Sequence, residues 1–326
     1  MNITLENIIA PVNDEMNRFE ELMRMFLTCD SPLLENVIEY VFGRKGKRIR
    51  PLLAVLSAAA TGKQLGDRTF AGAAAVELIH SATIIHDDVV DESDERRGRK
   101  SVNASWSSKI AVLVGDYLLS KALLIITDNK LHDMLDIMTR PICEMSEGEL
   151  MQIERSMNLD LSRKTYFEII QKKTAVLIAA SMSMGAKSVG ANNEFADKMY
   201  NIGQNIGIAF QIRDDIFDYH KTDKIGKPAG NDVVERKITL PLLHAISLVS
   251  QDERNRILKL VENAGENRDN VNLIRDFVNL HHGIEYAEKE ANNYCNKAIE
   301  LIDELPETPA KYALRDMSLY VVQRES

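Results

Sequence analysis

Apolar residues recur every three or four positions along many stretches of the 326-residue chain, which is the spacing of one face of an α-helix. Residues 195–219 show the pattern well. Their apolar positions are Phe195, Met199, Ile202, Ile206, Ala209, Phe210, Ile216 and Phe217. We find no sustained alternation of apolar and polar residues of the kind that indicates a β-strand. The pattern therefore predicts an all-α protein.

Breaks in the helical pattern are few, because the chain has only 16 glycines and 8 prolines. The predicted breaks lie near residues 61–62, 128–129, 185–193, 223–231 and 265–267. No Ser/Gly-rich or Pro-rich linker divides the chain, and no internal repeat is seen. We therefore expect one domain over residues 1–326.

Bulk composition limits the class of partner. The net charge of -9 argues against nucleic acid as the main partner, but it leaves an anionic small substrate open because local charge decides that. Three cysteines lie far apart and lack metal-ligand spacing, which suggests free thiols in a reducing cytoplasm. Uninterrupted apolar runs fall short of the ~18 residues that a membrane span needs, so we expect no transmembrane segment. The N-terminal residues also lack signal-peptide features.

An acidic cluster follows an apolar segment at residues 83–99, which read "TIIHDDVVDESDERRGR". Asp87 and Asp91 share one face of a helix, and Asp88 lies between them. Carboxylates this close repel each other unless solvent at a helix end or a hard cation neutralises them. Mg²⁺ is often held by one or two carboxylates together with substrate phosphates. This cluster alone leaves both interpretations open.

A second cluster repeats the spacing in residues 210–219, which read "FQIRDDIFDY". The polar positions of this segment form one stripe opposite the apolar one: Gln204, Gly207, Gln211, Asp214, Asp215 and Asp218. Three aspartates turned the same way among apolar neighbours are hard to explain as a solvated face. Two such clusters in one chain favour a shared cavity where both hold metal ions.

Basic residues accompany the acidic ones. Taken singly, each is most often a solvated charge. Beside two metal-binding clusters they favour contacts with phosphoryl oxygens, because arginine offers a planar fork and lysine a compact charge. The candidates are Lys47, Arg50, Arg96, Arg97, Lys173, Lys227 and Lys237.

Six segments, in order between about residues 43 and 245, resemble the all-trans polyprenyl diphosphate synthases, in particular the long-chain, octaprenyl type. They read "GKRIRP", "ELIHSATIIHDDVVDESDERRGR", "EGELMQ", "QKKTAVL", "FQIRDDIFD" and "KPAGNDVVERKITLPLL". One departure is Lys45, where the family often has glycine.

The resemblance implies a single large helical bundle of the isoprenoid synthase type, with a deep central cavity, in a homodimer. It implies two substrates, isopentenyl diphosphate and an allylic diphosphate, and about three Mg²⁺ ions per site. The implied metal ligands are Asp87, Asp88, Asp91, Asp214, Asp215 and Asp218. The implied contacts of the allylic diphosphate are Arg96, Lys173, Thr174, Gln211, Lys227 and Lys237. The implied contacts of isopentenyl diphosphate are Lys47, Arg50, His80 and Arg97; a core histidine is an equally good explanation of His80.

These residue types suit the chemistry of an allylic transfer. Breaking the allylic C–O bond leaves a carbocation and a diphosphate with extra negative charge, which Mg²⁺, lysine and arginine stabilise. Thr174 and Gln211 would aim oxygen dipoles at the cation, and apolar walls would exclude water. The released diphosphate is the base that we expect to take the proton. The residues expected to be catalytic are Asp87, Asp88, Asp91, Asp214, Asp215, Lys173 and Thr174.

Product length is predicted from the helix that ends at the first cluster. One turn advances ~5.4 Å, about one isoprene unit. Ala82 and Thr83, one turn before Asp87, are small, whereas short-chain members of the family place aromatic residues there. We therefore expect roughly seven to ten isoprene units, built on farnesyl diphosphate for quinone side chains. Further small or modest residues on this helix are Gly72, Ala75 and Val76, and candidates for the floor of the tunnel are Met138, Ile142 and Met145.

Four alternatives are weighed against this interpretation. A short-chain farnesyl or geranylgeranyl diphosphate synthase shares the motifs. A non-catalytic partner subunit usually loses one aspartate motif, and both are intact here. A terpene cyclase needs no isopentenyl site, so Lys47, Arg50 and His80 argue against it. A membrane prenyltransferase acting on an aromatic ring would need membrane spans. We expect a cytoplasmic enzyme with at most transient membrane contact for product release.

Overall fold

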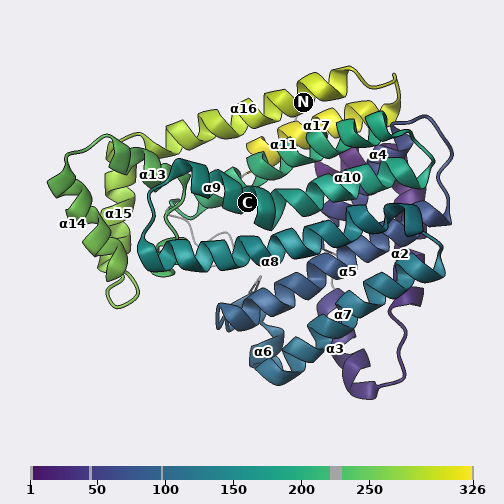
Figure 1. Cartoon of the computed structure of the whole chain (residues 1–326), viewed down its shortest axis with the longest axis horizontal. Coiled ribbons are helices and arrows are strands. Elements are labelled where there is room, and N and C mark those ends of the chain that lie inside the picture. The colour runs from purple at the N-terminus through teal and green to yellow at the C-terminus, as the bar shows by residue number, and fades with distance from the viewer. Residues whose placement is uncertain (1–2, 44–45, 97, 221–229, 325–326) are drawn as a thin grey trace. The chain divides into compact units, whose positions relative to one another are not determined.

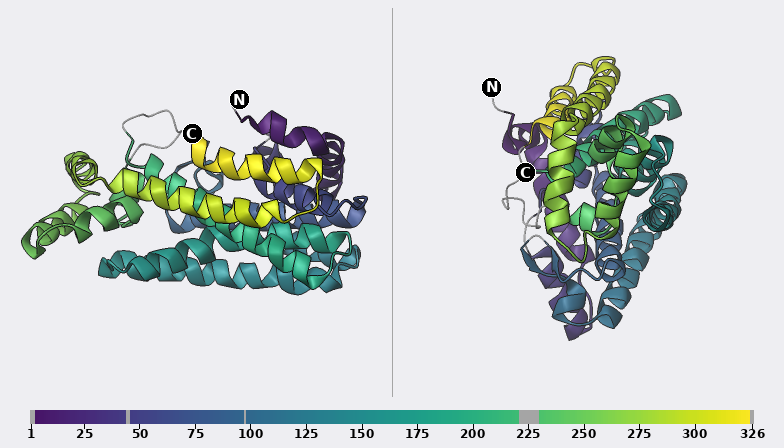
Figure 2. Two further views of the ribbon diagram at one scale, coloured as in Figure 1. Left: turned by 90° about the horizontal axis from the view of Figure 1, so that it is seen from above. Right: turned by 90° about the vertical axis from the view of Figure 1, so that its left-hand side faces the viewer.

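The computed structural model describes residues 3–43, 46–96, 98–220 and 230–324, and most of them are helical (Figure 1; two further directions in Figure 2). The prediction of an all-α protein is confirmed. In the described residues the strands are confined to one two-residue antiparallel pair, β1 (Glu95–Arg96) and β2 (Arg99–Lys100). The first helices are α1 (Leu5–Ile9), η1 (Ala10–Val12), α2 (Asn13–Phe26), α3 (Pro32–Phe42), α4 (Ile49–Ala59), α5 (Asp67–Val90), α6 (Val102–Ser105), α7 (Ser108–Asp128), η2 (His132–Met134) and α8 (Leu135–Asn158).

The remaining helices follow in chain order. They are α9 (Arg163–Ile170), η3 (Gln171–Ala175), α10 (Val176–Ser188), α11 (Asn193–Phe217), α12 (Asn231–Val234), α13 (Leu240–Ser247), α14 (Gln251–Glu262), α15 (Asp269–Leu280), α16 (Gly283–Asp303) and α17 (Pro309–Gln323).

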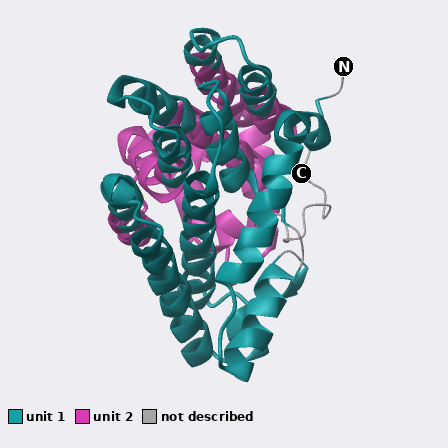
Figure 3. Ribbon diagram, turned by 90° about the vertical axis from the view of Figure 1, so that its right-hand side faces the viewer, with its two compact units in different colours: residues 1–142, 177–203, 299–317 teal, residues 143–176, 204–298, 318–326 magenta. Residues whose placement is uncertain are grey.

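The chain forms two compact units (Figure 3). Unit 1 contains Met1–Ile142, Leu177–Gly203 and Ile299–Met317. Unit 2 contains Cys143–Val176, Gln204–Ala298 and Ser318–Ser326. Every division falls inside a helix and none in a Gly- or Pro-rich linker, so no break in the helical pattern marks them. One domain over residues 1–326 stays a prediction.

Helix α5 is the centre of unit 1 and packs against α2, α4 and α7. Alanine is the best helix former, and the run "FAGAAAVELIHSA" makes α5 apolar all round, as expected of a buried helix. Its glycine permits a close approach, because a Cβ on Gly72 would meet Met184 Sδ at 2.2 Å. Helix α5 ends at the first aspartate cluster and therefore holds that cluster on a rigid element.

Unit 2 has its own apolar core around α9, η3, the C-terminal part of α11, α13 and α15. Helix α11 approaches η3 with backbone against backbone, since a Cβ on Gly207 would lie 2.5 Å from Ala175 Cα. Element η3 is a π-helix at "QKKTA". Single π-helical turns are rare and frequent at functional sites, and this one carries the predicted residues Lys173 and Thr174.

Helix α7 is long and apolar enough to cross a membrane, judged by length and composition only. A search for uninterrupted apolar runs does not find this helix, because charged residues such as Asp116 and Lys121 interrupt it. The core helix of a globular protein can have the same length and composition. Part of α7 is nevertheless exposed, including Val112, Leu113 and Leu124.

Candidate active site

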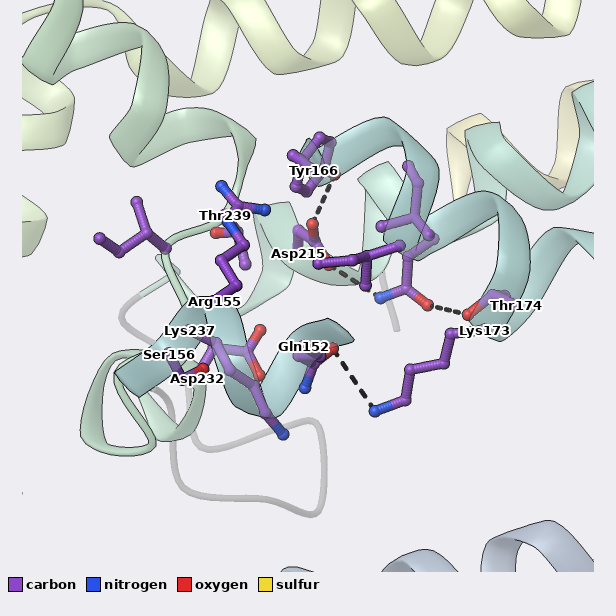
Figure 4. Close-up of a pocket in the computed structure, with 14 residues that line it drawn as sticks. Gln152, Arg155, Ser156, Tyr166, Lys173, Thr174, Asp215, Asp232, Lys237 and Thr239 are labelled. Atoms are coloured by element: carbon purple, nitrogen blue, oxygen red, sulfur yellow. Dashed lines mark hydrogen bonds between the residues drawn. The ribbon is translucent and has the colours of Figure 1, made fainter. Parts of the chain in front are cut away.

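Asp215 is the most deeply buried member of the second aspartate cluster, with 2% of its surface exposed. Tyr166 on α9 donates its hydroxyl to Asp215 Oδ2 at 2.6 Å. Gln211, one turn earlier on α11, donates its amide to Asp215 Oδ1 at 2.8 Å (Figure 4). Both carboxylate oxygens therefore accept hydrogen bonds from fixed neighbours, and the side chain has one defined orientation.

The hydrogen-bond chain continues to the π-helix. A carboxylate accepts only, so the amide group of Gln211 faces Asp215 and its carbonyl oxygen faces the other way. Thr174 donates its hydroxyl to that oxygen at 2.7 Å. The proton of Thr174 is thereby directed at Gln211, and its oxygen keeps lone pairs that can face a positive charge. Thr174 and Gln211 were both predicted for this purpose.

Asp218 lies just beyond the end of α11. Its Oδ1 accepts the backbone N–H groups of Gly230 at 3.0 Å and Asn231 at 2.9 Å, and its Oδ2 accepts that of Asp232 at 3.1 Å. The carboxylate therefore holds the start of α12 against the end of α11. Its predicted role as a metal ligand stays a prediction beside this structural one.

The second cluster is a costly place for negative charge. Burial raises the pKa of Asp215 well above its usual range, and the carboxylate of Asp232 raises it further against the hydrogen bonds of Tyr166 and Gln211. Burial and Asp232 likewise raise the pKa of Asp218 to about 7, although three backbone N–H groups oppose them. Buried carboxylates that repel one another are stabilised by a cation. These oxygen ligands fit a hard divalent metal ion.

In the described residues, no three carboxylate, imidazole or thiolate side chains are arranged to hold a metal ion by themselves. This does not conflict with a magnesium site, because Mg²⁺ keeps several waters and is usually bound through one or two carboxylates and substrate phosphates. The protein and the substrate would then complete the site together.

Asp214, the third aspartate of this cluster, is part-exposed and contacts the C-terminal segment. Arg324 donates from Nη2 to Asp214 Oδ1 at 2.5 Å. In return Arg213 donates from Nε and Nη2 to the Arg324 carbonyl at 3.2 and 3.1 Å. Two consecutive residues of α11 therefore bind Arg324: Arg213 binds its backbone carbonyl, and Asp214 binds its guanidinium group. This contact was not predicted from the sequence.

A pocket of about 120 Å³ in unit 2 is lined by the hydrogen-bonded residues Tyr166, Asp215, Gln211 and Thr174, among others (Figure 4). Five of its residues were predicted from the sequence: Lys173, Thr174, Gln211, Asp215 and Lys237. Six further polar or charged residues were missed: Gln152, Arg155, Ser156, Tyr166, Asp232 and Thr239. The motif "EGELMQ" signalled Gln152, and "KPAGNDVVERK" contained Asp232, but neither residue was singled out.

The two pocket lysines are each paired with a carboxylate. Lys173 Nζ lies 2.5 Å from Glu149 Oε2 and donates to Gln152 Oε1 at 3.5 Å. Lys237 forms an ion pair with Glu235. These contacts hold both ammonium groups at the pocket wall, where they can bind phosphoryl oxygens.

The first cluster ends α5 in unit 1. Asp88 is buried and accepts a hydrogen bond from Arg96 Nη1 at 2.7 Å, whereas Asp87 is half-buried and Asp91 exposed. Arg96 is carried by the β1–β2 hairpin, whose turn contains Gly98 at φ 71°. The predicted substrate contacts Arg97 and Lys227 lie outside the described residues.

The predicted isopentenyl site also lies in unit 1. Arg50 Nη1 on α4 lies 2.8 Å from His80 Nε2 on α5, so two residues 30 positions apart come together as the prediction requires. Lys47 lies just before α4. The neighbouring Arg48 was missed. It has a positive φ of 46° and is paired with Glu77 at 2.7 Å and Glu20 at 3.3 Å.

The residues predicted to set product length are mostly closed off. Ala82 is fully buried, and half-buried Thr83 donates to the His80 carbonyl at 2.9 Å. Met184 covers Gly72, so a growing chain cannot cross that face of α5 unless Met184 moves. The floor candidates Met138 and Met145 are buried, as an ordinary core would also require.

Comparison with known proteins identifies the family. The model of the polyprenyl synthetase family matches residues 31–278, about three quarters of the chain and parts of both units. The chain belongs to the polyprenyl synthetase family. It is a polyprenyl diphosphate synthase, a transferase of the trans-prenyltransferase class.

Two curated relatives match this synthase over nearly their whole length. It is 36% identical to heptaprenyl diphosphate synthase component 2 of Geobacillus stearothermophilus over 309 residues, 94% of each chain. It is 34% identical to octaprenyl diphosphate synthase of Escherichia coli (strain K12) over 300 residues, 92% of each chain.

Among solved structures, this synthase resembles a polyprenyl synthase of Caulobacter crescentus CB15 complexed with calcium and isoprenyl diphosphate. The TM-score is 0.92 at 32% identity, with 100% of this chain and 99% of the other covered. The isoprenoid synthase fold expected from the sequence is therefore confirmed.

Proposed function

We propose that this synthase extends farnesyl diphosphate with successive isopentenyl diphosphates to a long all-trans chain of roughly seven to ten isoprene units. The product would supply quinone side chains, and the enzyme would act in the cytoplasm with transient membrane contact for product release. The observation that carries the chain length is the small side chain of Ala82, one turn before Asp87. An aromatic side chain at that position would block the helix face along which the product grows.

The relatives support a long product without fixing it. One of the two is named for a heptaprenyl and the other for an octaprenyl product, at 36% and 34% identity. Identity at this level establishes the reaction class, while product length depends on a few side chains. The short-chain alternative is therefore decided by experiment.

The residues divide the chemistry among themselves. Asp87, Asp88 and Asp91 in unit 1 and Asp214, Asp215 and Asp218 in unit 2 would hold about three Mg²⁺ ions, which supply positive charge to the leaving diphosphate. Lys173 and Lys237 would bind the oxygens of the allylic diphosphate together with Arg96 and Lys227. Arg50, His80, Lys47 and Arg97 would hold isopentenyl diphosphate.

Thr174 is the group best placed to stabilise the allylic cation. Its hydroxyl proton is donated to Gln211, so the oxygen presents lone pairs instead of a proton to the pocket. A neutral hydroxyl in a closed site stabilises a cation through its dipole and is a weak nucleophile. Proton loss would then fall to the released diphosphate.

A homodimer is part of the proposal. Helix α7 exposes the large apolar side chains Val112, Leu113 and Leu124, and exposed apolar patches mark interaction surfaces. A second copy of the chain would cover them. Light scattering on the purified protein measures its mass, and a monomer would count against this assignment.

The function is tested by incubating the purified chain with farnesyl diphosphate, labelled isopentenyl diphosphate and Mg²⁺, and sizing the product. We expect roughly seven to ten units. A product of only three or four units identifies a short-chain synthase. No condensation at all identifies a non-catalytic partner subunit.

The length assignment is tested by Ala82→Phe, which should shorten the product by one or more units because the ring projects about one helical turn from Asp87. Thr83→Ser is the control, since it keeps a small hydroxyl residue, and its product should match that of the wild type. Circular dichroism checks the fold of the overpacked variant. An unchanged product length in a folded Ala82→Phe protein would contradict the assignment.

A further inference from the structure

Arg155 on α8 is a buried cation of the pocket that no sequence motif singled out. Only 8% of its surface is exposed, and it lines the pocket together with Lys173 and Lys237. Its Nη2 atom is buried and has no hydrogen-bond partner among the described residues. A buried, charged donor without a partner is rare in folded proteins and calls for an explanation such as a bound ion.

The guanidinium of Arg155 is held in place by two other contacts. Its Nε donates to the Asp160 carbonyl at 3.1 Å, and its Cζ atom lies over the Tyr166 ring, 5.6 Å from the ring centre. The hydroxyl of that ring is bonded to Asp215. The Nε contact and the Tyr166 ring fix the position of the guanidinium. The Nη2 atom is therefore the donor that is available to a ligand.

Charge and size indicate the class of ligand. Three cations, Arg155, Lys173 and Lys237, line the pocket with the carboxylates of Asp215 and Asp232. Burial lowers the pKa of Arg155, while Asp160 is the largest of the charges that oppose the shift; an arginine stays protonated in any case. A pocket of about 120 Å³ is far larger than the ~10–15 Å³ that one water needs. A polyatomic anion fits these features.

We propose that Arg155 donates from Nη2 to a phosphoryl oxygen of the diphosphate group that occupies this pocket. The proposal rests on the proposed function and adds an arginine to the lysines expected there. Arginine suits the position because its planar group can stack on Tyr166 and still present N–H donors at its edge.

The test measures binding of inorganic diphosphate by calorimetry in saturating Mg²⁺. Arg155→Met should raise the Kd about 10- to 100-fold, the loss expected for a hydrogen bond to a charged group. Arg155→Lys keeps the charge but loses the fork, and its Kd should rise about 3- to 10-fold. Arg163→Met is the matched control. Arg163 also lies over an aromatic ring, that of Phe167 at 5.4 Å, but it is exposed and paired with Glu290 at 3.0 Å. Its Kd should stay at the wild-type value.

Thermal unfolding is recorded for each variant, and the lysine variant decides the test if the methionine variant fails to fold. Wild-type affinity in folded Arg155→Lys and Arg155→Met proteins would overturn the proposal, and so would a wild-type protein that binds no diphosphate. Failure of the function itself is seen separately. If the wild type makes no prenyl product but Arg155→Met still weakens diphosphate binding, the subsite stands and the synthase assignment falls.

Discussion

The two aspartate clusters share the spacing D-D-x-x-D but differ in what surrounds them. In unit 1 the cluster ends a helix, with Asp88 bonded to Arg96 and Asp91 exposed. In unit 2 Asp215 and Asp218 are enclosed by hydrogen-bond donors, Tyr166 and Gln211 for one and three backbone N–H groups for the other. The same motif is therefore built once near solvent and once in the interior.

The difference lies in how each cluster meets the cost of its charge. In unit 1 a nearby arginine supplies positive charge directly. In unit 2 the donors to Asp215 and Asp218 are neutral. Burial raises the pKa of both carboxyl groups, and the carboxylate of Asp232 raises it further. The interior cluster thus depends more on a cation that arrives with the substrate, and its aspartates also hold the fold together.

The largest expected effect is a difference in stability between variants of the last aspartate in each motif, Asp218 and Asp91. Asp218→Ala leaves the N–H groups of Asn231 and Asp232 without their acceptor, while that of Gly230 keeps the Asp218 backbone carbonyl. The variant should lower the free energy of unfolding by about 2–4 kcal/mol. Asp91→Ala removes a negative charge from the C-terminal end of α5, where the helix dipole disfavours it, so the change should stay within about 0.5 kcal/mol. Urea unfolding of the two variants measures the difference. Condensation activity should fall in both.

Equal losses of stability would contradict this view of the clusters. Asp218→Asn is the conservative companion, because its side-chain oxygen can still accept one or two of the N–H groups. It should therefore lie between the wild type and Asp218→Ala in the same unfolding experiment.

Local sequence patterns predicted those parts of the site whose residues lie within one short segment. Helical periodicity predicted the fold class, and the motif segments predicted five residues of the unit 2 pocket. Lys173 and Thr174 were found because "QKKTA" is contiguous, although its π-helical form was not foreseen. The resemblance placed Arg50 and His80 at one substrate, but their direct contact was not predicted, since nothing in either segment alone shows the other.

The residues that were missed are those whose partners lie far along the chain. Tyr166 is 49 positions from Asp215, and Arg324 is 110 positions from Asp214. A lone tyrosine or arginine in a helix has no local signature of its partner. Arg155 was missed for a further reason, because its significance lies in a donor left unbonded, and only coordinates show that.

A smaller effect is expected from Tyr166→Phe, which removes one donor from Asp215 without changing the shape of the core. Gln211 and Thr174 then lose part of their fixed orientation, so kcat should fall about 10- to 100-fold, as for other groups that orient a site. The KM for isopentenyl diphosphate should change little, because the predicted contacts of that substrate lie in unit 1. Steady-state kinetics measure both constants.

Tyr219→Phe is the control for the loss of a buried hydroxyl. Tyr219 is equally buried, and its hydroxyl bonds to Thr239 at 3.1 Å instead of to an aspartate. Both variants should lose about 1 kcal/mol of stability, but only Tyr166→Phe should lose kcat. If the two variants had the same kcat, the hydrogen-bond chain from Tyr166 to Thr174 would have no part in catalysis.

In each cluster an arginine donates a hydrogen bond to one aspartate, Arg96 to Asp88 and Arg324 to Asp214. Removing such an arginine should give the smallest of the expected effects. Arg324 is the simpler one to test, since no substrate contact is predicted for it. If it orients Asp214 for a metal ion, Arg324→Ala should weaken Mg²⁺ binding about 10-fold, the lower end for such partners, because Asp214 is 40% exposed. Calorimetric titration of the diphosphate-bound protein with Mg²⁺ measures the Kd.

Arg315→Ala is the control, because Arg315 lies on α17, the helix that Arg324 follows, is half-exposed and lies 3.9 Å from Asp303. Its Mg²⁺ affinity should equal that of the wild type. Tighter binding in Arg324→Ala would show that the arginine competes with the metal ion as a cation instead of orienting its ligand. The arginines of the two clusters would then have different roles, although the two aspartate motifs have the same spacing.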